Sequence, residues 1–181
     1  MAHIEKTMKS EHVYKGHIIS VRVDEVELEN GKAAMREVIE HPGGVCVLPL
    51  AMDDTITMVK QFRYPYKEEV LELPAGKRSP GEDPLECGRR ELTEETGLIA
   101  ARFKSLGELY PSPGYVDEVI YLYLATGLTR TNPSPDEDEF LDVCTMPLEK
   151  AFEKVFSGEI KDAKTQIALL KAYAMRQKGQ I

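Results

Sequence analysis

The segment that decides the fold is GKRSPGEDPLECGRRELTEETGL, residues 76–98. Its second half predicts a helix over residues 84–96. Asp83 suits the N-cap position, because its carboxylate can accept hydrogen bonds from the first free backbone amides. Pro84 suits the first helical position, and Gly97 stands where a left-handed glycine commonly ends a helix. These local signals define both ends of the helix.

Three glutamates crowd this helix, since Glu91, Glu94 and Glu95 fall within an arc of roughly 100°. Like charges three and four residues apart repel each other. The ordinary interpretation is a solvated face, on which Arg90 and Glu94 form an exposed ion pair worth a few tenths of a kcal/mol. The alternative is a metal site that includes Glu82, because Mg²⁺ and Mn²⁺ prefer clustered carboxylate oxygens. Bound ions would cancel the repulsion and offer open positions to phosphate oxygens.

The wider spacing favours the metal site. Gly76, five residues, Glu82, seven residues and then residues 90–98 match GX5EX7REUXEEXGU at every fixed position, where U is a bulky aliphatic residue. At about 7% usage for each residue type, the seven exact matches have a chance on the order of 10⁻⁸. The sequence therefore resembles the Nudix hydrolases. The resemblance implies the α/β class, with an α/β/α sandwich around a mixed sheet, and Mg²⁺-dependent hydrolysis of a nucleoside diphosphate linked to another group.

The resemblance also implies roles for the residues of the motif. Glu91 and Glu95 would bind a metal ion directly, and Glu94 and Glu82 would bind a further ion or orient water molecules. The carbonyl of Ala75, immediately before the motif, would also face a metal ion. Arg90, with its rigid guanidinium fork, would orient these carboxylates rather than contact substrate.

Three other segments resemble the ADP-ribose pyrophosphatase subgroup: REVIEHPGGVCVLPL, VKQFRYPYKEEVLELPAGK and YPSPGYVDEVIYLYLATGL. A proline about fifteen residues beyond the motif marks that subgroup, and Pro113 lies fifteen residues beyond Leu98. A plain turn is the alternative explanation for Pro113. The activity expected from this resemblance is hydrolysis of ADP-ribose to AMP and ribose 5-phosphate. Another ADP-sugar, GDP-mannose or an oxidised nucleotide is an alternative substrate, and a non-catalytic nucleotide sensor is an alternative function.

Substrate contacts are expected from residues on both sides of the motif. A pyrophosphate needs cations, so Arg36 and Arg63 are candidate phosphate clamps, although each could instead be a surface arginine. Glu37 resembles a family position near the adenine or ribose. Tyr14, Tyr64 and Tyr115 are candidates to stack on the base, with a partly buried core tyrosine as the alternative for each. The loop residues predicted to bind substrate are Pro113, Gly114 and Tyr115.

The nucleophile of such a hydrolysis is a water molecule, and it needs a carboxylate as general base. In the resembled subgroup the base comes from a loop beyond the motif. The matching segment is SPDEDEF, residues 134–140. Glu139 is the first candidate and Glu137 the second, while a merely solvated acidic loop is the alternative.

The bulk properties exclude several other functions. The chain has a net charge of −8 and no basic arm or patch, which argues against a nucleic-acid partner. No apolar run reaches roughly 18 residues, so we expect no membrane span. The three cysteines form neither a zinc-finger spacing nor an even-numbered disulfide set. A cytoplasmic location is expected.

The chain is predicted to have two regions. An Asn-Gly turn at residues 30–31 predicts a hairpin over residues 18–41. Residues 1–42 are expected to form an N-terminal β-hairpin region, and residues 43–181 the Nudix hydrolase domain. The resemblance implies that the first region joins a homodimer with shared active sites. Further strands are predicted at 43–51, 55–62, 69–76, 101–109, 117–126 and 140–145, and further helices at 147–158 and 161–179.

Overall fold

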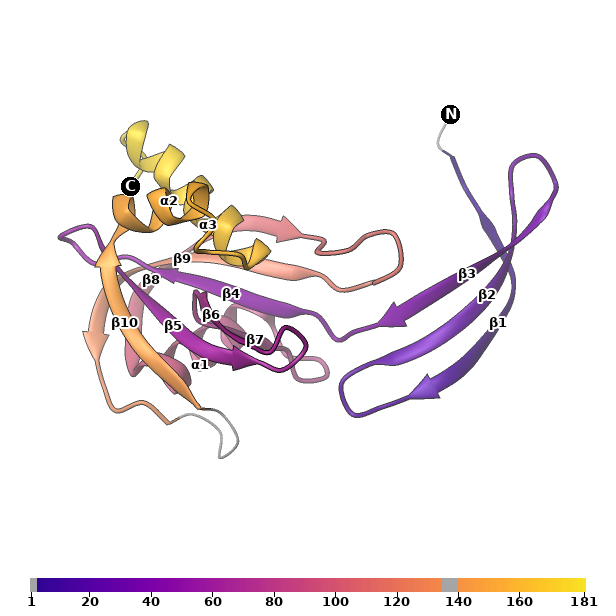
Figure 1. Ribbon diagram of the computed structural model, residues 1–181, viewed down its shortest axis with the longest axis horizontal. Coiled ribbons are helices and arrows are strands. Elements are labelled where there is room, and N and C mark those ends of the chain that lie inside the picture. Colours follow the sequence, from indigo (N-terminus) through magenta and orange to yellow (C-terminus); the bar gives the residue numbers. More distant parts are fainter. Residues whose placement is uncertain (1–2, 135–139) are drawn as a thin grey trace. The chain divides into compact units, whose positions relative to one another are not determined.

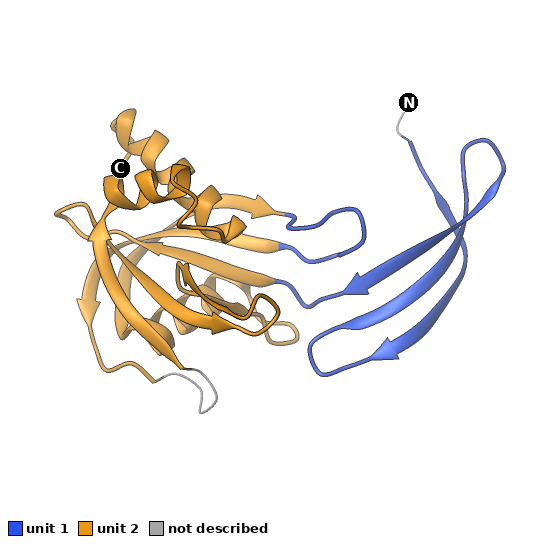
Figure 2. Cartoon of the chain, viewed as in Figure 1, with its two compact units in different colours: residues 1–43, 110–119 blue, residues 44–109, 120–181 orange. Residues whose placement is uncertain are grey.

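The computed structural model describes residues 3–134 and 140–181. The chain divides into two compact units (Figure 2). Unit 1 is built from residues 1–43 and 110–119, and unit 2 from residues 44–109 and 120–181. Unit 1 has one sheet and unit 2 has two, and the two units are described separately below.

Unit 1 is a three-stranded antiparallel sheet in the order β1-β2-β3. The predicted hairpin is formed by β2 (Ser20–Glu27) and β3 (Ala33–Glu40). The turn between them contains Gly31, whose φ of 75° suits glycine. The sequence did not indicate β1 (Lys6–Lys15), because all ten of its residues are exposed and its side chains show no apolar alternation. Backbone pairing with β2 defines this strand instead.

Unit 2 contains two sheets and all three helices of the described chain (Figure 1). A mixed sheet has the order β7-β4-β9-β8, in which β4 and β9 are parallel and the other pairs antiparallel. An antiparallel sheet has the order β10-β5-β6. The strands are β4 (Gly44–Pro49), β5 (Thr55–Arg63), β6 (Glu68–Glu72), β7 (Ala75–Lys77), β8 (Leu98–Leu109), β9 (Ile120–Arg130) and β10 (Leu141–Pro147). The helices are α1 (Pro84–Thr96), α2 (Leu148–Phe156) and α3 (Ala163–Gln177).

The layers of unit 2 follow from the alternation of side chains along β4. Cys46 and Leu48 are buried in the apolar cluster to which α2 and α3 contribute. Val47, between them, is buried in a second cluster with Leu92 of α1. Successive side chains of a strand point to opposite faces, so α1 covers one face of the sheet and α2 and α3 cover the other. The predicted α/β/α sandwich with a mixed sheet is confirmed.

The predicted strand at residues 69–76 is instead two strands in different sheets. β6 ends at Glu72 and pairs with β5, whereas β7 begins at Ala75 and pairs with β4. Between them, the Leu73 amide donates to Thr165 Oγ1 at 2.9 Å. The following residue, Pro74, has no amide hydrogen and cannot donate to a ladder. The chain therefore changes sheets immediately before the motif.

None of the helices in the described residues combines the length and apolar character needed to span a membrane.

Candidate metal and substrate site

Helix α1 begins and ends at the predicted residues. Asp83 Oδ1 accepts from the backbone amides of Leu85 at 2.9 Å and Glu86 at 3.3 Å. At the other end Gly97 has a φ of 64°, and its amide donates to the Thr93 carbonyl at 2.9 Å. Both caps satisfy backbone groups that a helix end leaves without a partner. The caps fix which residues of the motif face the sheet.

Two glutamates of the motif lie on the packed side of α1. Glu91 is 6% exposed and Glu95 2% exposed, whereas the side chain of Glu94 is 33% exposed. The interpretation of this turn as a solvated face is therefore wrong for Glu91 and Glu95. Removing a carboxylate from water costs several kcal/mol unless partners compensate it. The burial of two such groups side by side requires a nearby source of positive charge.

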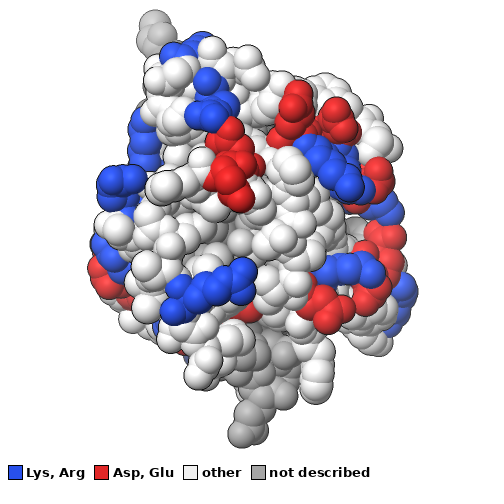
Figure 3. Space-filling model, turned by 90° about the vertical axis from the view of Figure 1, so that its left-hand side faces the viewer, with Lys and Arg blue, Asp and Glu red and all other residues white. Residues whose placement is uncertain are grey.

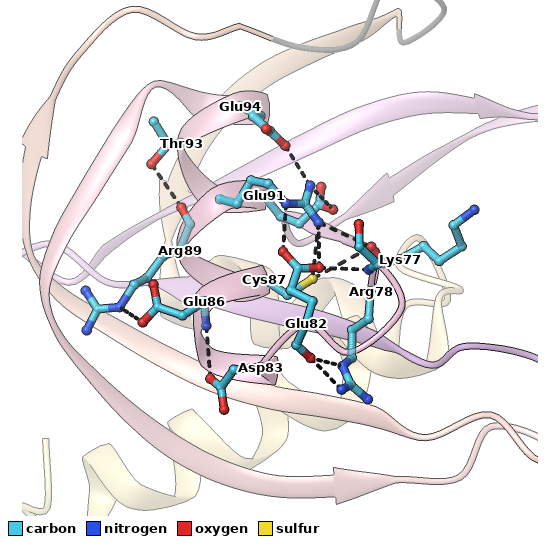
Figure 4. A network of polar contacts seen from close by, with 12 residues as sticks. Lys77, Arg78, Glu82, Asp83, Glu86, Cys87, Arg89, Glu91, Thr93 and Glu94 are labelled. Carbon is cyan, nitrogen blue, oxygen red and sulfur yellow. Dashed lines mark hydrogen bonds and ion pairs between the residues drawn. The ribbon is translucent and has the colours of Figure 1, made fainter.

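Arg90 supplies positive charge to this cluster (Figure 4). Its Nε donates to Glu82 Oε1 at 2.9 Å, and its Nη1 donates to Glu91 Oε1 at 2.7 Å and to Glu94 Oε2 at 2.8 Å. The hydrogen bond from Arg90 lowers the pKa of Glu82 to about 2. The same carboxylates raise the pKa of the guanidinium. Arg90 thus contacts three of the four motif glutamates, and its role in orienting them stays a prediction.

The backbone ahead of α1 passes directly over the buried carboxylates. A Cβ atom added to Gly76 would lie 2.1 Å from Glu91 Cδ, so only glycine fits this position with Glu91 in its present place. The amide of Ala75 donates to Glu95 Oε2 at 3.2 Å. Residues 75–76 therefore form one wall of a small cradle whose other wall is α1.

The donors of this cradle are of the chemical type that a hard divalent cation requires. Four carboxylates lie around it, and the missing side chain of Gly76 leaves access to Glu91. Within residues 3–134 and 140–181, however, no three acidic, histidine or cysteine side chains are already arranged as a metal-binding group. The guanidinium of Arg90 lies among the carboxylates in this arrangement. A cation would therefore compete with Arg90 for the same oxygens.

The candidate phosphate clamp Arg63 is engaged in an ion pair. Its Nε and Nη2 donate to the two oxygens of Glu72, at 2.6 and 2.7 Å. Glu72 is 1% exposed and also accepts from Lys164 Nζ at 2.5 Å. Lys164 in turn pairs with Asp162 at 2.9 Å. Two cations and two carboxylates thus compensate one another at the end of β6.

Glu72 and Lys164 could not be identified from the sequence. No local pattern distinguishes Lys164 from the other lysines of the predicted helix, and its partner Glu72 is 92 residues away. Burial alone would raise the pKa of Glu72, but the hydrogen bond from Arg63 and the charge of Lys164 outweigh it and hold this pKa below the ordinary 4.5. Burial alone would lower the pKa of Lys164, yet Asp162 and Glu72 raise it. Both groups are therefore charged at neutral pH.

This network predicts how stability depends on pH. Because the folded-state pKa of Glu72 is depressed, its stabilisation is complete above the ordinary value of 4.5 and is lost as pH falls below it. Glu72→Gln is expected to cost about 3–5 kcal/mol at pH 7 and to flatten the fall in stability below 4.5. Urea unfolding at a series of pH values measures both effects.

Glu69→Gln is the matched control. Glu69 lies on the same strand as Glu72, but it is exposed and pairs with Lys60 at the surface. It is expected to cost less than about 1 kcal/mol and to leave the pH slope unchanged. If the free energy of unfolding falls equally steeply below pH 4.5 in wild type and in Glu72→Gln, Glu72 is not the group whose protonation destabilises the fold.

Five predicted substrate residues lie in unit 1: Arg36, Glu37, Pro113, Gly114 and Tyr115. Arg36 on β3 pairs with Glu5 through two hydrogen bonds, at 2.8 and 2.5 Å, and Glu37 beside it is exposed. Gly114 and Tyr115 lie in the 110–119 segment, which joins β3 through the hydrogen bond from the Ile39 amide to the Tyr115 carbonyl, 2.8 Å. Within unit 1, the 110–119 segment therefore lies beside β3, the strand that carries Arg36.

The structure of the 110–119 segment bears on the alternatives for Tyr115 and Pro113. Tyr115 is 55% exposed, so the alternative of a core tyrosine is wrong. Pro113 lies within a turn in which the amides of Tyr115 and Val116 donate to the Ser112 carbonyl, at 3.2 and 3.1 Å. A structural role for Pro113 is thus compatible with a role in binding.

Both candidate bases, Glu137 and Glu139, lie outside the described residues. The chain just before them is fixed to the end of α1. The Thr131 amide donates to the Gly97 carbonyl at 2.7 Å, and the Ser134 amide to the Glu94 carbonyl at 3.0 Å. Ser134, the last described residue before residues 135–139, therefore lies beside the end of the motif helix.

Two family models match the chain. The model of the NUDIX domain matches residues 40–166. The model of the nucleoside diphosphate sugar hydrolase N-terminal domain matches residues 5–39.

Similar curated proteins have pyrophosphatase and activator names. The chain is 43% identical to an ADP-ribose pyrophosphatase of Bacillus subtilis (strain 168), over 91% of this chain and 90% of that protein. It is 41% identical to a methanol dehydrogenase activator of Bacillus methanolicus over the same shares. It is 35% identical to a GDP-mannose pyrophosphatase of Enterobacter sp. (strain 638), over 74% of this chain and 75% of that protein.

A solved structure has the same fold. The crystal structure of an ADP compounds hydrolase superimposes with a TM-score of 0.84 at 22% identity, over 98% of this chain and 97% of that chain.

Proposed function

Because this chain belongs to the Nudix family, we propose that it is an ADP-ribose pyrophosphatase, which hydrolyses ADP-ribose to AMP and ribose 5-phosphate. The observation that carries the proposal is the pair of buried glutamates, Glu91 and Glu95, under the backbone of Gly76. Relatives with ADP-ribose pyrophosphatase names support the choice of substrate. The N-terminal match to a nucleoside diphosphate sugar hydrolase model supports the broader substrate class.

Mg²⁺, with Mn²⁺ as a substitute, is the proposed cofactor. The ligands would be the carboxylates of Glu91 and Glu95, with Glu94, Glu82 and the Ala75 carbonyl completing the set. The ion would neutralise the phosphate oxygens and lower the pKa of a water molecule.

Side chains of this protein remove the proton from water, orient the glutamates and bind the substrate. Glu139, or failing that Glu137, removes the proton from the attacking water, whose oxygen then bonds to one phosphorus of the pyrophosphate. The bond from that phosphorus to the bridging oxygen breaks, and the bridging oxygen leaves with the other phosphate group, which gives AMP and ribose 5-phosphate. Arg90 keeps Glu82, Glu91 and Glu94 in place through its fork of hydrogen bonds. Arg36 and Arg63 compensate the charge of the pyrophosphate, and Glu37 and the residues Pro113, Gly114 and Tyr115 bind the nucleoside and sugar.

We also propose that residues 1–42 form the dimerisation region of a homodimer with shared active sites, and residues 43–181 its hydrolase domain. Exposed apolar side chains on β1 support this, since Met8 and Val13 are each 58% exposed and Tyr14 is 57% exposed. A three-stranded sheet needs a packed apolar face to be stable alone. A second copy of the chain would cover such a face.

The net charge of the chain and its free cysteines support proposals on its binding partners and its cellular location. Acidic and basic side chains are interspersed on the face drawn in Figure 3, and the net charge is −8, which supports a nucleotide-sugar substrate over nucleic acid. Cys46, Cys87 and Cys144 are free, as is usual in a reducing compartment. We propose a cytoplasmic enzyme that acts without a membrane partner.

Another nucleoside diphosphate sugar is the second candidate substrate, because a GDP-mannose pyrophosphatase is among the similar proteins. A non-catalytic sensor is the weaker alternative. Such a module has no need of Glu82, Glu91, Glu94 and Glu95, and all four stand in this sequence at the motif spacing.

The test is a comparison of kcat/KM for ADP-ribose, GDP-mannose, diadenosine polyphosphate and an oxidised dGTP, with product identification. We expect AMP and ribose 5-phosphate from ADP-ribose, at the highest kcat/KM of the panel. Faster turnover of another compound would overturn ADP-ribose as the proposed substrate and leave the proposed metal site on α1 unchanged. Tight ADP-ribose binding without turnover of anything would favour the sensor.

A further inference from the structure

The first turn of α3 contacts the short segment that crosses between the two sheets of unit 2. The hydroxyl of Thr165, a residue with 0% exposure, accepts a hydrogen bond from the Leu73 amide at 2.9 Å. One residue earlier, Lys164 bonds to Glu72. The far end of the chain therefore binds two consecutive residues of the crossing segment, 92 positions away.

The same turn is itself rigidly held. Asp162 caps α3, because its Oδ2 accepts from the Thr165 amide at 2.9 Å and its Oδ1 accepts from Lys164 Nζ at 2.9 Å. The Thr165 amide thus donates a hydrogen bond to the cap, and the Thr165 hydroxyl oxygen accepts one from the Leu73 amide. A side chain fixed at its backbone and buried on all sides is a firm anchor for the segment that it contacts.

The backbone of residues 73–76 connects the Thr165 contact to the carboxylates of Glu91 and Glu95. After Leu73, the Pro74 carbonyl accepts from the Val47 amide at 2.9 Å. The Ala75 amide then donates to Glu95 at 3.2 Å. Gly76 lies against the Glu91 carboxylate so closely that a Cβ atom would overlap it. The backbone of residues 73–76 is therefore the layer that separates the α3 anchor from the candidate metal ligands.

We propose that Thr165 is a positioning residue for the metal site: through Leu73 it fixes the 73–76 backbone, and this backbone sets the positions of the Glu91 and Glu95 carboxylates. The inference deepens the proposed function and rests on it, because it takes these two glutamates as metal ligands. Thr165 touches neither substrate nor metal in this account. Its effect is transmitted by one buried hydrogen bond.

Thr165→Val is the decisive variant, since valine has nearly the shape of threonine and lacks the hydroxyl. The Leu73 amide then remains buried without its acceptor, and the segment must shift to find another. We expect the dissociation constant for Mn²⁺, titrated by electron paramagnetic resonance without substrate, to rise by about tenfold or more. Amide hydrogen exchange of Ala75 in the metal-free protein should become faster as well. Thr165→Ser, which restores the acceptor, should return both values close to those of wild type.

Ala172→Gly is the matched control, because Ala172 is also fully buried on α3, about two turns further along. Glycine destabilises the helix without removing a polar contact. The control should lower Tm by several degrees and leave Mn²⁺ affinity and Ala75 exchange unchanged.

The outcomes separate the two proposals. Wild-type Mn²⁺ affinity in Thr165→Val, or an equal loss of affinity in Ala172→Gly, overturns the positioning role alone. A wild-type protein that binds no Mn²⁺ overturns the proposed function, and the positioning role with it.

Discussion

Glu95→Gln is expected to reduce kcat for ADP-ribose by roughly 10³-fold while the protein stays folded. Glutamine has nearly the same shape and still offers an oxygen to the Ala75 amide, but it carries no charge for a metal ion. Removal of one carboxylate from a crowded acidic helix also relieves repulsion, so Tm should be unchanged or higher. Steady-state kinetics with Mg²⁺ and a thermal melt measure the two quantities.

Glu86→Gln is the control on the same helix. Glu86 has a side chain 66% exposed and pairs with Arg89 at 3.3 Å, away from the buried glutamates. Its removal should change kcat by less than about twofold, because an exposed pair contributes little. Equal activity of wild type and Glu95→Gln would show that this carboxylate takes no part in the reaction.

Gly76→Ala is expected to abolish most metal binding and turnover. The added methyl group would lie 2.1 Å from Glu91 Cδ, a distance at which either the carboxylate or the backbone of β7 must move. The φ angle of Gly76 is not in the left-handed region, so the expected cost comes from this overlap rather than from backbone strain. We expect Mn²⁺ affinity to fall by about tenfold or more, with a parallel loss of kcat.

The same variant separates an effect on the site from a general loss of stability. If Gly76→Ala only loosens β7, Tm falls and the metal affinity of the folded protein is retained. If it displaces Glu91, metal affinity falls at temperatures far below Tm. Wild-type affinity and turnover would contradict the close packing of the backbone on this carboxylate.

The sequence alone predicts the elements whose signals are local. Both ends of α1 follow from Asp83, Pro84 and Gly97, which act within one turn of the helix. The gathering of Glu91, Glu94 and Glu95 on one arc of the helix also follows from their spacing, whereas the burial of Glu91 and Glu95 is seen only in the structure.

Elements that depend on distant partners could not be predicted. β1 is a strand only because β2 lies beside it, since its own side chains are all exposed. At the break between β6 and β7, the Leu73 amide donates to Thr165, which is 92 residues away. The pairing of Arg63 with Glu72 likewise forms only in the folded sheet, where Lys164 also bonds to Glu72. Such contacts join residues with no relation in the sequence pattern.

The most direct test of the central claim is AMP formation from ADP-ribose by the metal-stripped protein as Mg²⁺ is added back. We expect no AMP before the addition, a saturable rise in its rate of formation with Mg²⁺ or Mn²⁺, and loss of activity when a chelator is added. AMP formed at the full rate without a divalent cation, or none at any Mg²⁺ concentration, would contradict the assignment of the buried glutamates to a metal site for pyrophosphate hydrolysis.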